Sequence, residues 1–345
     1  MDSTPLIPLD AFRQGAYACF TRAAAALFEV VDALLTEERA RSFVELSQAP
    51  GFQRQWPSLY AALRDGQIDR DALRRLMVGR LPRPAPGDRL VLGVDTSPIH
   101  RPEAHTAADR TLVYSPNLPA GSIPVRPGWS FSTVAVLPDP PSSWTSLLDN
   151  ARVPSTGTAT TVGAAQLATR VPLVPVRPLL LGDGHDGSTA WVVATGGLAC
   201  DQLLRTKRDR VLYRPAPPRT GNRGAPKKDG ARFKGSDPTT HDTPDAVWTG
   251  TDAAGHACTV TAWCGLHLKS CRDVPLTVLR VTRAGAVGTA RDPRESWFWW
   301  LGGEMPPLAT IPPLYARRFG LEHGDRFDKQ ALLWEAPRLR TPERF

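Results

Sequence analysis

Four residues near the end of the chain have types and spacing suited to binding a metal ion beside phosphate groups. They are Tyr315, Arg318, Glu322 and Lys329. On a helix with roughly 100° between successive residues, they fall at roughly 0°, −60°, −20° and −40° and share one narrow face. A glutamate there can supply a metal ligand while the two cations neutralise phosphate charge. Most charged stripes on helices are instead solvated faces held by salt bridges.

Two aspartates each follow a short apolar run that predicts a buried strand. Asp95 ends the segment Arg89–Asp95, and Asp183 follows the apolar residues of Pro178–Gly187. Acidic residues at the carboxyl ends of buried strands lie where ligands bind in an open α/β sheet. Aspartate before Thr-Ser or Gly is also an ordinary turn residue. Asp186 competes for the second position, and we prefer Asp183 because it directly follows the strand.

Three carboxylates from these segments could together hold two hard cations. Oxygen ligands suit Mg²⁺ and Mn²⁺. Two such ions can activate a water molecule or a 3′-hydroxyl and stabilise the oxygen that leaves a phosphodiester. The sequence therefore predicts Asp95, Asp183 and Glu322 as metal ligands and catalytic residues of an enzyme that cuts and joins nucleic acid.

The same segments resemble the DDE transposases of bacterial insertion sequences, in the branch marked by Tyr-x2-Arg-x3-Glu-x6-Lys. The chain matches this signature from Tyr315 to Lys329, after GVDTS around Asp95 and LLGDGHDG around Asp183. The resemblance covers about residues 85–345. It implies an RNase H-like catalytic domain that binds two Mg²⁺ or Mn²⁺ ions. Such a domain would nick the ends of the element and transfer the strands into target DNA.

The resemblance also implies partners and roles for the residues around the carboxylates. Arg318 and Lys329 would contact phosphates of the DNA end, and Tyr315 would support the terminal nucleotide. The DNA partners would be the terminal inverted repeats of the element and its target. A homodimer would act on the paired ends.

Two other hypotheses stay open. The chain ends at Phe345, sooner after the catalytic helix than is usual in the family it resembles. One alternative is therefore a truncated, catalytically inactive DNA-binding remnant. The other is an RNase H-like nuclease that acts on a different nucleic acid and has no preference for inverted repeats.

The positive charge of the chain is concentrated in one stretch. The formal net charge is +8, residues 1–88 are neutral, and residues 201–234 hold eleven Lys and Arg against three Asp. Exposed basic residues displace condensed counterions from a polyanion. The stretch alone is equally compatible with a solvated loop. The residues that we predict to bind DNA here are Lys207, Arg208, Arg210, Lys227 and Lys228.

The first part of the chain has a helical pattern that ends in a proline-rich segment. Apolar residues recur at three- and four-residue spacing from Ala11, and Leu81–Asp88 contains three prolines. Shorter helices are expected at Glu38–Ser47, Ser58–Arg64 and Arg70–Val78. We therefore expect an all-helical N-terminal domain over residues 1–84, a candidate for recognising DNA ends, and a catalytic domain over residues 85–345.

The catalytic domain is expected to be of the α/β class, with a β-strand-rich insertion at about 191–290. Besides the two strands that carry the aspartates, Pro127–Leu137 is typical of a strand. Helices are expected at Ser142–Asn150, Thr161–Arg170 and Leu314–Trp334. Within the insertion the expected strands are TAWVVAT, DRVLYRP, ACTVTAW and PLTVLRV. The tryptophans of ESWFWWLGG are expected to pack in the core.

The composition favours a cytoplasmic protein, associated with the bacterial nucleoid and without a membrane partner. The sequence has neither an apolar run of about 18 residues nor the features of a signal peptide. Its five cysteines are odd in number and widely spread, which indicates reduced thiols. A zinc site is disfavoured because the spacings lack tight ligand pairs. The residues concerned are His256, Cys258, Cys264, His267 and Cys271.

Overall fold

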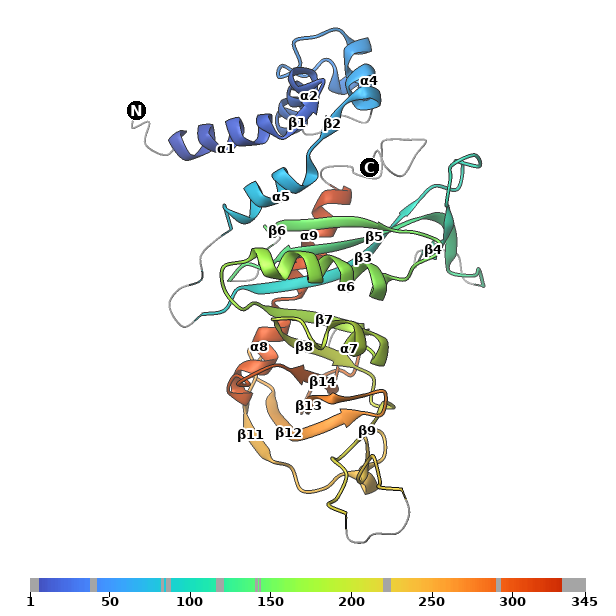
Figure 1. Ribbon diagram of the computed structural model, residues 1–345, viewed down its shortest axis with the longest axis vertical. Helices are drawn as coiled ribbons and strands as arrows, with labels where there is room; N and C mark the ends of the chain where they lie inside the picture. The colour runs from blue at the N-terminus through green and yellow to red at the C-terminus, as the bar shows by residue number, and fades with distance from the viewer. Residues whose placement is uncertain are drawn as a thin grey trace.

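A twelve-stranded mixed sheet runs through most of the chain, with helices on both of its faces (Figure 1). The computed structural model describes residues 6–37, 42–81, 84, 88–115, 121–139, 142, 144–219, 225–289 and 293–330. Among the described residues, no helix is both long and apolar enough to cross a bilayer. All five cysteines are free.

The described part of the amino-terminal segment contains five helices and a small sheet. The helices are α1 (Leu6–Ala18), α2 (Ala24–Thr36), α3 (Phe43–Leu46), α4 (Trp56–Asp65) and α5 (Arg70–Val78). Between them, β1 (Phe20–Arg22) pairs antiparallel with β2 (Gln67–Ile68). Val30, Ala33 and Leu59 belong to the hydrophobic cluster of this segment. The expected all-helical domain is therefore not what the structure shows, since β1 and a left-handed Ala23 (φ 54°) interrupt the helical pattern.

Five central strands form the part of the sheet that carries the predicted aspartates. They are β3 (Val91–His100), β5 (Val125–Val136), β6 (Ser146–Val153), β7 (Leu179–Gly187) and β8 (Asp201–Thr206). They lie in the order β6-β5-β3-β7-β8, in which β3, β7 and β8 are mutually parallel and β5 is antiparallel to both neighbours. The short strand β4 (Thr111–Tyr114) also pairs with β5. This mixed α/β arrangement is consistent with an RNase H-like fold.

The sheet continues from β8 into the strand-rich part of the chain. The strands there are β9 (Val211–Tyr213), β10 (Arg232–Lys234), β11 (Ala246–Thr251), β12 (Ala257–Leu268), β13 (Cys271–Arg283) and β14 (Glu295–Leu301). β14 is antiparallel to β8 and β13, so this part extends the central sheet instead of forming a separate one. The strands expected from DRVLYRP, ACTVTAW and PLTVLRV are confirmed. Trp297, Trp299 and Trp300 of β14 are buried, as expected for core residues.

Two pairs of helices cover opposite faces of the sheet. On one face lie α6 (Ala159–Arg170) and α7 (Thr189–Thr195), whose residues Leu167 and Trp191 are completely buried. A capping box of Thr158 and Thr161 begins α6. On the other face, α8 (Ile311–Ala316) and α9 (Phe319–Gln330) bury Ile311 and Leu321. The 3₁₀ turns are η1 (Val171–Leu173), η2 (Pro238–Thr240) and η3 (Leu308–Thr310).

Two segments adopt the opposite of the expected secondary structure. The helix expected at Ser142–Asn150 is wrong, because β6 pairs there along β5. The strand expected from TAWVVAT is also wrong, because this segment is α7. Ser188 caps α7 by accepting the N–H of Trp191, and Trp191, Val192 and Thr195 are buried. In both segments tertiary pairing and packing override the local apolar pattern.

The final helix is divided in two instead of running on from Leu314. α8 ends at Ala316, and the N–H groups of Arg318 and Leu321 donate to carbonyls three residues earlier, which tightens the chain between the helices. Residues 331–334 of the expected helix lie outside the described residues. Tyr315, Arg318, Glu322 and Lys329 therefore do not project from a single straight helix.

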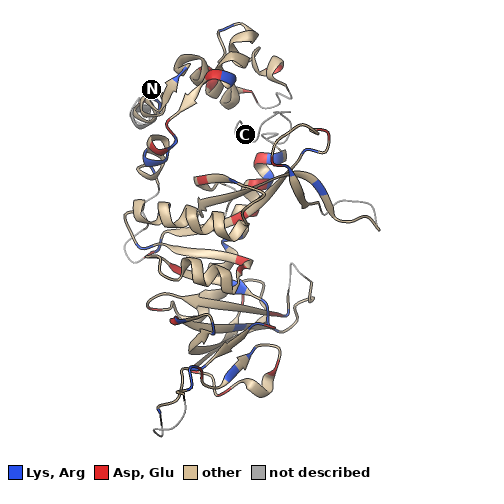
Figure 2. Ribbon diagram, turned by 45° about the vertical axis from the view of Figure 1, so that its right-hand side comes forward, with Lys and Arg blue, Asp and Glu red and all other residues tan. Residues whose placement is uncertain are grey.

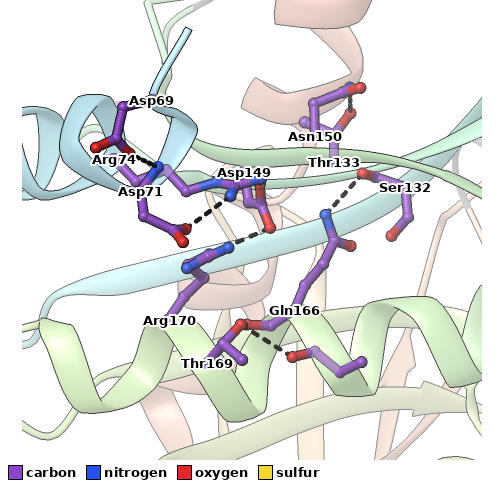
Figure 3. A network of polar contacts seen from close by, with 11 residues as sticks. Asp69, Asp71, Arg74, Ser132, Thr133, Asp149, Asn150, Gln166, Thr169 and Arg170 are labelled. Carbon is purple, nitrogen blue, oxygen red and sulfur yellow. Dashed lines mark hydrogen bonds and ion pairs between the residues drawn. The ribbon is translucent and has the colours of Figure 1, made fainter. Parts of the chain in front are cut away.

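Asp149 of β6 joins the amino-terminal segment to the sheet (Figure 3). Its carboxylate accepts hydrogen bonds from Arg74 of α5, at 2.6 and 2.9 Å, and from Arg170 of α6 at 3.2 Å. Asp69 caps the same helix α5. Asn150, the next residue of β6, donates to Thr133 of β5. A buried carboxylate held by two arginines therefore fixes α5 against the edge of the sheet.

Candidate active site

Asp95, Asp183 and Glu322 converge on one buried arginine. Arg318 lies 2.7 Å from Glu322 Oε1, 3.2 Å from Asp95 Oδ1 and 3.6 Å from Asp183 Oδ2. Its side chain is only 6% exposed. Segments separated by more than two hundred residues in the sequence thus bring the three predicted carboxylates together.

Strand register explains why the two aspartates are neighbours. In the parallel pair of β3 and β7, Val91 lies beside Leu179 and Gly93 beside Leu181. Side chains alternate along a strand, so two residues further on Asp95 and Asp183 follow on the same face. That face is the one covered by α9. The apolar residues of both strands, buried on both sides of the sheet, hold this register.

A bulge at the end of β7 separates the roles of Asp183 and Asp186. Gly182 pairs with Leu204 of β8 but Gly187 with Thr206, so the register shifts and residues 183–186 form a bulge. Asp183 Oδ1 accepts the N–H of His185 at 2.7 Å, while Asp186 Oδ2 accepts the N–H of Asp183 at 3.2 Å. Asp183 makes the ion pair with Arg318. The role of Asp183 as a metal ligand, in preference to Asp186, stays a prediction.

Close packing of α9 on β3 places Glu322. A Cβ atom on Gly93 would lie 3.2 Å from Leu321 Cδ2 and 3.1 Å from Leu137 Cδ2, so the helix approaches β3 where β3 carries no side chain. Glu322 follows Leu321 directly and its side chain is 45% exposed. The carboxylate therefore stands at the border between the buried cluster and solvent.

Burial, with a smaller contribution from neighbouring acids, raises several carboxyl pKa values. Burial raises the pKa of Asp186 to about 8, with a further contribution from Asp183. Burial and the nearby charge of Asp95 raise the pKa of Asp325 to about 7. Burial also raises the pKa of Asp95, although Arg318 opposes this shift. For these three acids the buried surroundings therefore favour the protonated form over the charged one.

The donor set fits a divalent cation, although its present spacing does not. Carboxylate oxygens gathered around one centre are suited to a hard, oxygen-liganded cation such as Mg²⁺. Among the described residues, however, no three acidic, His or Cys side chains are positioned to hold a metal ion as they stand. Arg318 contacts the same oxygens that a metal ion would use. Asp95, Asp183 and Glu322 would hold the ions after Arg318 moves away.

The residues predicted to bind the DNA end lie around this cluster. Tyr315 is buried and packs edge-on against Phe298, with 4.7 Å between the ring centroids. Burial raises the pKa of Tyr315 to about 12. Lys329 Nζ donates to the carbonyl of Pro98 at 3.0 Å. Lys329 thus lies beside β3, and Tyr315 lies beside β14. Their roles toward DNA stay predictions.

The predicted basic residues fall into two groups. Lys207 and Arg208 are exposed directly after β8, where Thr206 pairs with Gly187 of the bulge. Arg210 is half-buried. Lys227 and Lys228 are exposed in the loop before β10. Figure 2 shows blue segments of Lys and Arg in the lower part of the molecule. Only the first group follows a strand that pairs with β7.

Parts of the basic stretch are ion-paired instead of open to a polyanion. Arg214 binds Asp242 at 2.6 Å, and Asp229 accepts hydrogen bonds from Arg272 at 2.7 Å and His267 at 3.0 Å. The ion pair of Arg214 therefore reduces the positive charge that the stretch offers to a polyanion.

Sequence reasoning missed two residues beside the cluster, Arg205 and Asp325. Arg205 lies opposite the β7 bulge, on the same face of β8 as Leu203, and its charge acts on the Tyr315 hydroxyl. Asp325 lies one turn after Glu322 and interacts electrostatically with Asp95. The three-residue spacing from Glu322 could have revealed Asp325. Arg205 becomes visible only when the pairing of β7 with β8 is known.

Comparison with known proteins adds one match. A family model described as DDE superfamily endonuclease matches residues 16–264. The matched region includes Asp95 and Asp183 and ends before Glu322. No curated protein matches the chain. Because the family model covers most of the sequence, the chain belongs to the DDE superfamily of endonucleases.

Proposed function

We propose that the chain is a DNA transposase that nicks the ends of a mobile element and joins them to target DNA. The observation that carries the proposal is the convergence of Asp95, Asp183 and Glu322 on Arg318 in a DDE superfamily endonuclease. Acids in an exposed salt-bridge network need not converge on one centre, whereas the carboxylates that hold the ions of a metal-dependent phosphodiester enzyme must. The proposal includes an RNase H-like catalytic domain over residues 85–345.

The side chains of the site have distinct tasks in this proposal. When bound, two Mg²⁺ or Mn²⁺ ions supply an activated nucleophile and stabilise the leaving oxygen. Asp95, Asp183 and Glu322 fix the ion positions, and Asp186 holds the Asp183 backbone through its N–H. Arg318, Arg205 and Lys329 bind the phosphates on either side of the scissile bond. Tyr315 supports the terminal nucleotide.

Binding of the remaining DNA uses surfaces further from the carboxylates. The exposed Lys207 and Arg208 extend the site along β8, and Lys227 and Lys228 contact DNA beyond it. The amino-terminal segment, over residues 1–84, recognises the terminal repeat. A homodimer brings the two element ends together.

The test is metal-dependent nicking of DNA taken from the sequence that flanks the gene, in which the proposal expects inverted repeats. The chain is expected to nick this DNA in Mg²⁺, and Asp95→Ala is expected to abolish nicking. Asp139→Asn is the matched control, because this exposed acid pairs with Arg317 outside the carboxylate cluster. Its nicking rate should equal that of the unaltered chain.

Two results would replace the proposal with another function. Cleavage without preference for inverted repeats would indicate an RNase H-like nuclease. Salt-sensitive DNA binding that survives Asp95→Ala, without cleavage in either metal, would indicate an inactive DNA-binding remnant.

A further inference from the structure

Arg318 is the cation that satisfies the carboxylate cluster in the DNA-free protein. It reaches all three carboxylates from the tight turn between α8 and α9, within 2.7 to 3.6 Å. Burial lowers its pKa, but Asp95, Asp183 and Glu322 outweigh this effect and raise it, so the guanidinium stays charged. Its buried Nε has no hydrogen-bond partner. In the described part of the chain, the ion pairs of Arg318 are therefore with the carboxylates, and its Nε has no polar anchor.

A metal ion and this guanidinium compete for the same oxygen atoms. Mg²⁺ must approach carboxylate oxygens to about 2.0–2.1 Å and prefers strict octahedral geometry. The guanidinium now contacts Oε1 of Glu322, Oδ1 of Asp95 and Oδ2 of Asp183. Occupation of these oxygens by two dications would leave Arg318 buried beside additional positive charge. It would then need another anion.

A DNA phosphate has the geometry to be that anion. The planar guanidinium fork binds phosphate through two parallel hydrogen bonds, as it binds carboxylate. Glu322 is nearly half exposed, so the cluster opens to solvent on the side from which a DNA strand can approach Arg318. A phosphate that takes Arg318 removes the internal competitor of the metal ions.

We propose that Arg318 is an exchangeable counterion that couples metal binding to DNA binding. Without DNA it occupies the carboxylates and weakens metal binding. With DNA it transfers to a phosphate and the carboxylates become available. The inference rests on the proposed function, since it assumes that the three carboxylates are the metal ligands. It predicts that the DNA-free protein is protected from loading metal and cutting unselected DNA.

The first test measures Mn²⁺ binding to the DNA-free chain by the electron paramagnetic resonance of unbound Mn²⁺. Arg318→Gln is expected to bind Mn²⁺ about 5- to 150-fold more tightly than the unaltered chain, the usual range of coupling between sites. Arg317→Gln is the matched control, because the neighbouring arginine binds Asp139 and the Leu137 carbonyl instead of the cluster. Its Mn²⁺ affinity should be unchanged. Equal or weaker Mn²⁺ binding by folded Arg318→Gln overturns the inference.

A reciprocal measurement on the unaltered chain needs no variant that could fail to fold. Linkage requires that metal improve DNA affinity by the same factor by which DNA improves metal affinity. The probe is a duplex taken from the DNA that flanks the gene, and its affinity is measured by fluorescence anisotropy with and without Ca²⁺. Tighter binding in Ca²⁺ is expected. An affinity that Ca²⁺ leaves unchanged overturns the inference.

The two proposals fail in different ways. The chain could nick DNA at the inverted repeats in the presence of metal while Arg318→Gln leaves its Mn²⁺ affinity unchanged. That result supports the transposase proposal and overturns the counterion exchange. Enhanced Mn²⁺ binding by Arg318→Gln without nicking of any DNA retains the exchange as a property of an inactive relative. Absence of Mn²⁺ binding in both forms overturns the exchange.

Discussion

Neutralising Asp149 should strongly destabilise the protein, because it is a buried acid that balances two arginines. Asp149 is 4% exposed and receives three hydrogen bonds from Arg74 and Arg170, at 2.6, 2.9 and 3.2 Å. Asp149→Asn retains the shape but removes the charge. Breaking a buried ion pair on one side costs about 3–5 kcal/mol, since the remaining charge stays buried without compensation. We expect a loss within that range.

Asp71 provides a control that uses the same arginine. It binds Arg74 at 3.1 Å, but its side chain is 69% exposed. Exposed pairs contribute at most about 1 kcal/mol, so Asp71→Asn should change the free energy of unfolding little. Burial, and not the presence of an ion pair, is what distinguishes the two variants.

Urea unfolding followed by tryptophan fluorescence and circular dichroism measures both losses. A double-mutant cycle between Arg74→Ala and Asp149→Asn should give an interaction energy of about 0.5–3 kcal/mol, because the two side chains are in direct contact. The reasoning is refuted if Asp149→Asn costs no more than Asp71→Asn, or if the cycle is additive. Either result would mean that the network of Figure 3 does not hold α5 against the sheet.

Three further predictions concern the bulge, pH and DNA. Gly187→Ala should abolish nicking and lower the midpoint of urea unfolding, because its Cβ would lie 1.9 Å from the Arg205 carbonyl oxygen. Gly184→Ala, whose Cβ meets nothing within 4 Å, should do neither; equal effects would contradict this account. Burial raises the pKa of Asp201, but hydrogen bonds from Arg177 and other groups outweigh it and lower the pKa overall. Its stabilisation is therefore present above about pH 4 and lost as pH falls through the folded-state pKa. The difference in unfolding free energy between the unaltered chain and Asp201→Asn should shrink below about pH 4, and a constant difference down to pH about 2 argues against it. Lys207→Ala should reduce the salt dependence of DNA affinity by about one phosphate contact, as measured by anisotropy at several salt concentrations. An unchanged slope would place Lys207 away from the DNA.

The positions of the chemical residues could be predicted because strand ends and residue types carry that information locally. Apolar runs before Asp95 and Asp183 predicted the two strands, and the signature around Glu322 located the third acid. The sequence could not predict that the three carboxylates converge on Arg318. That convergence follows from the strand register and from the ion pairs in the structure.

The failures occurred where tertiary contacts decide the outcome. The sequence of β6 predicts a helix. The contacts of Asp149 with Arg74 and of Asn150 with Thr133, which join β6 to other elements, cannot be seen in the sequence. The contiguous apolar residues of α7 predict a strand. The cap by Ser188 and the burial of the segment against the sheet show that it is a helix. A helical wheel assumes one continuous helix and therefore cannot predict the break between α8 and α9. Arg318 lies in that break and forms an ion pair with Asp95.

The central claim is that Asp95, Asp183 and Glu322 are metal ligands, and exchange of each for cysteine tests it most directly. A thiolate is a poor ligand for Mg²⁺ and a better one for Mn²⁺. The account predicts that Asp95→Cys, Asp183→Cys and Glu322→Cys each lose nicking of inverted-repeat DNA in Mg²⁺ and regain part of it in Mn²⁺. Nicking in Mg²⁺ at the unaltered rate by any of the three would contradict the assignment of that residue. Undiminished nicking by all three would contradict the account.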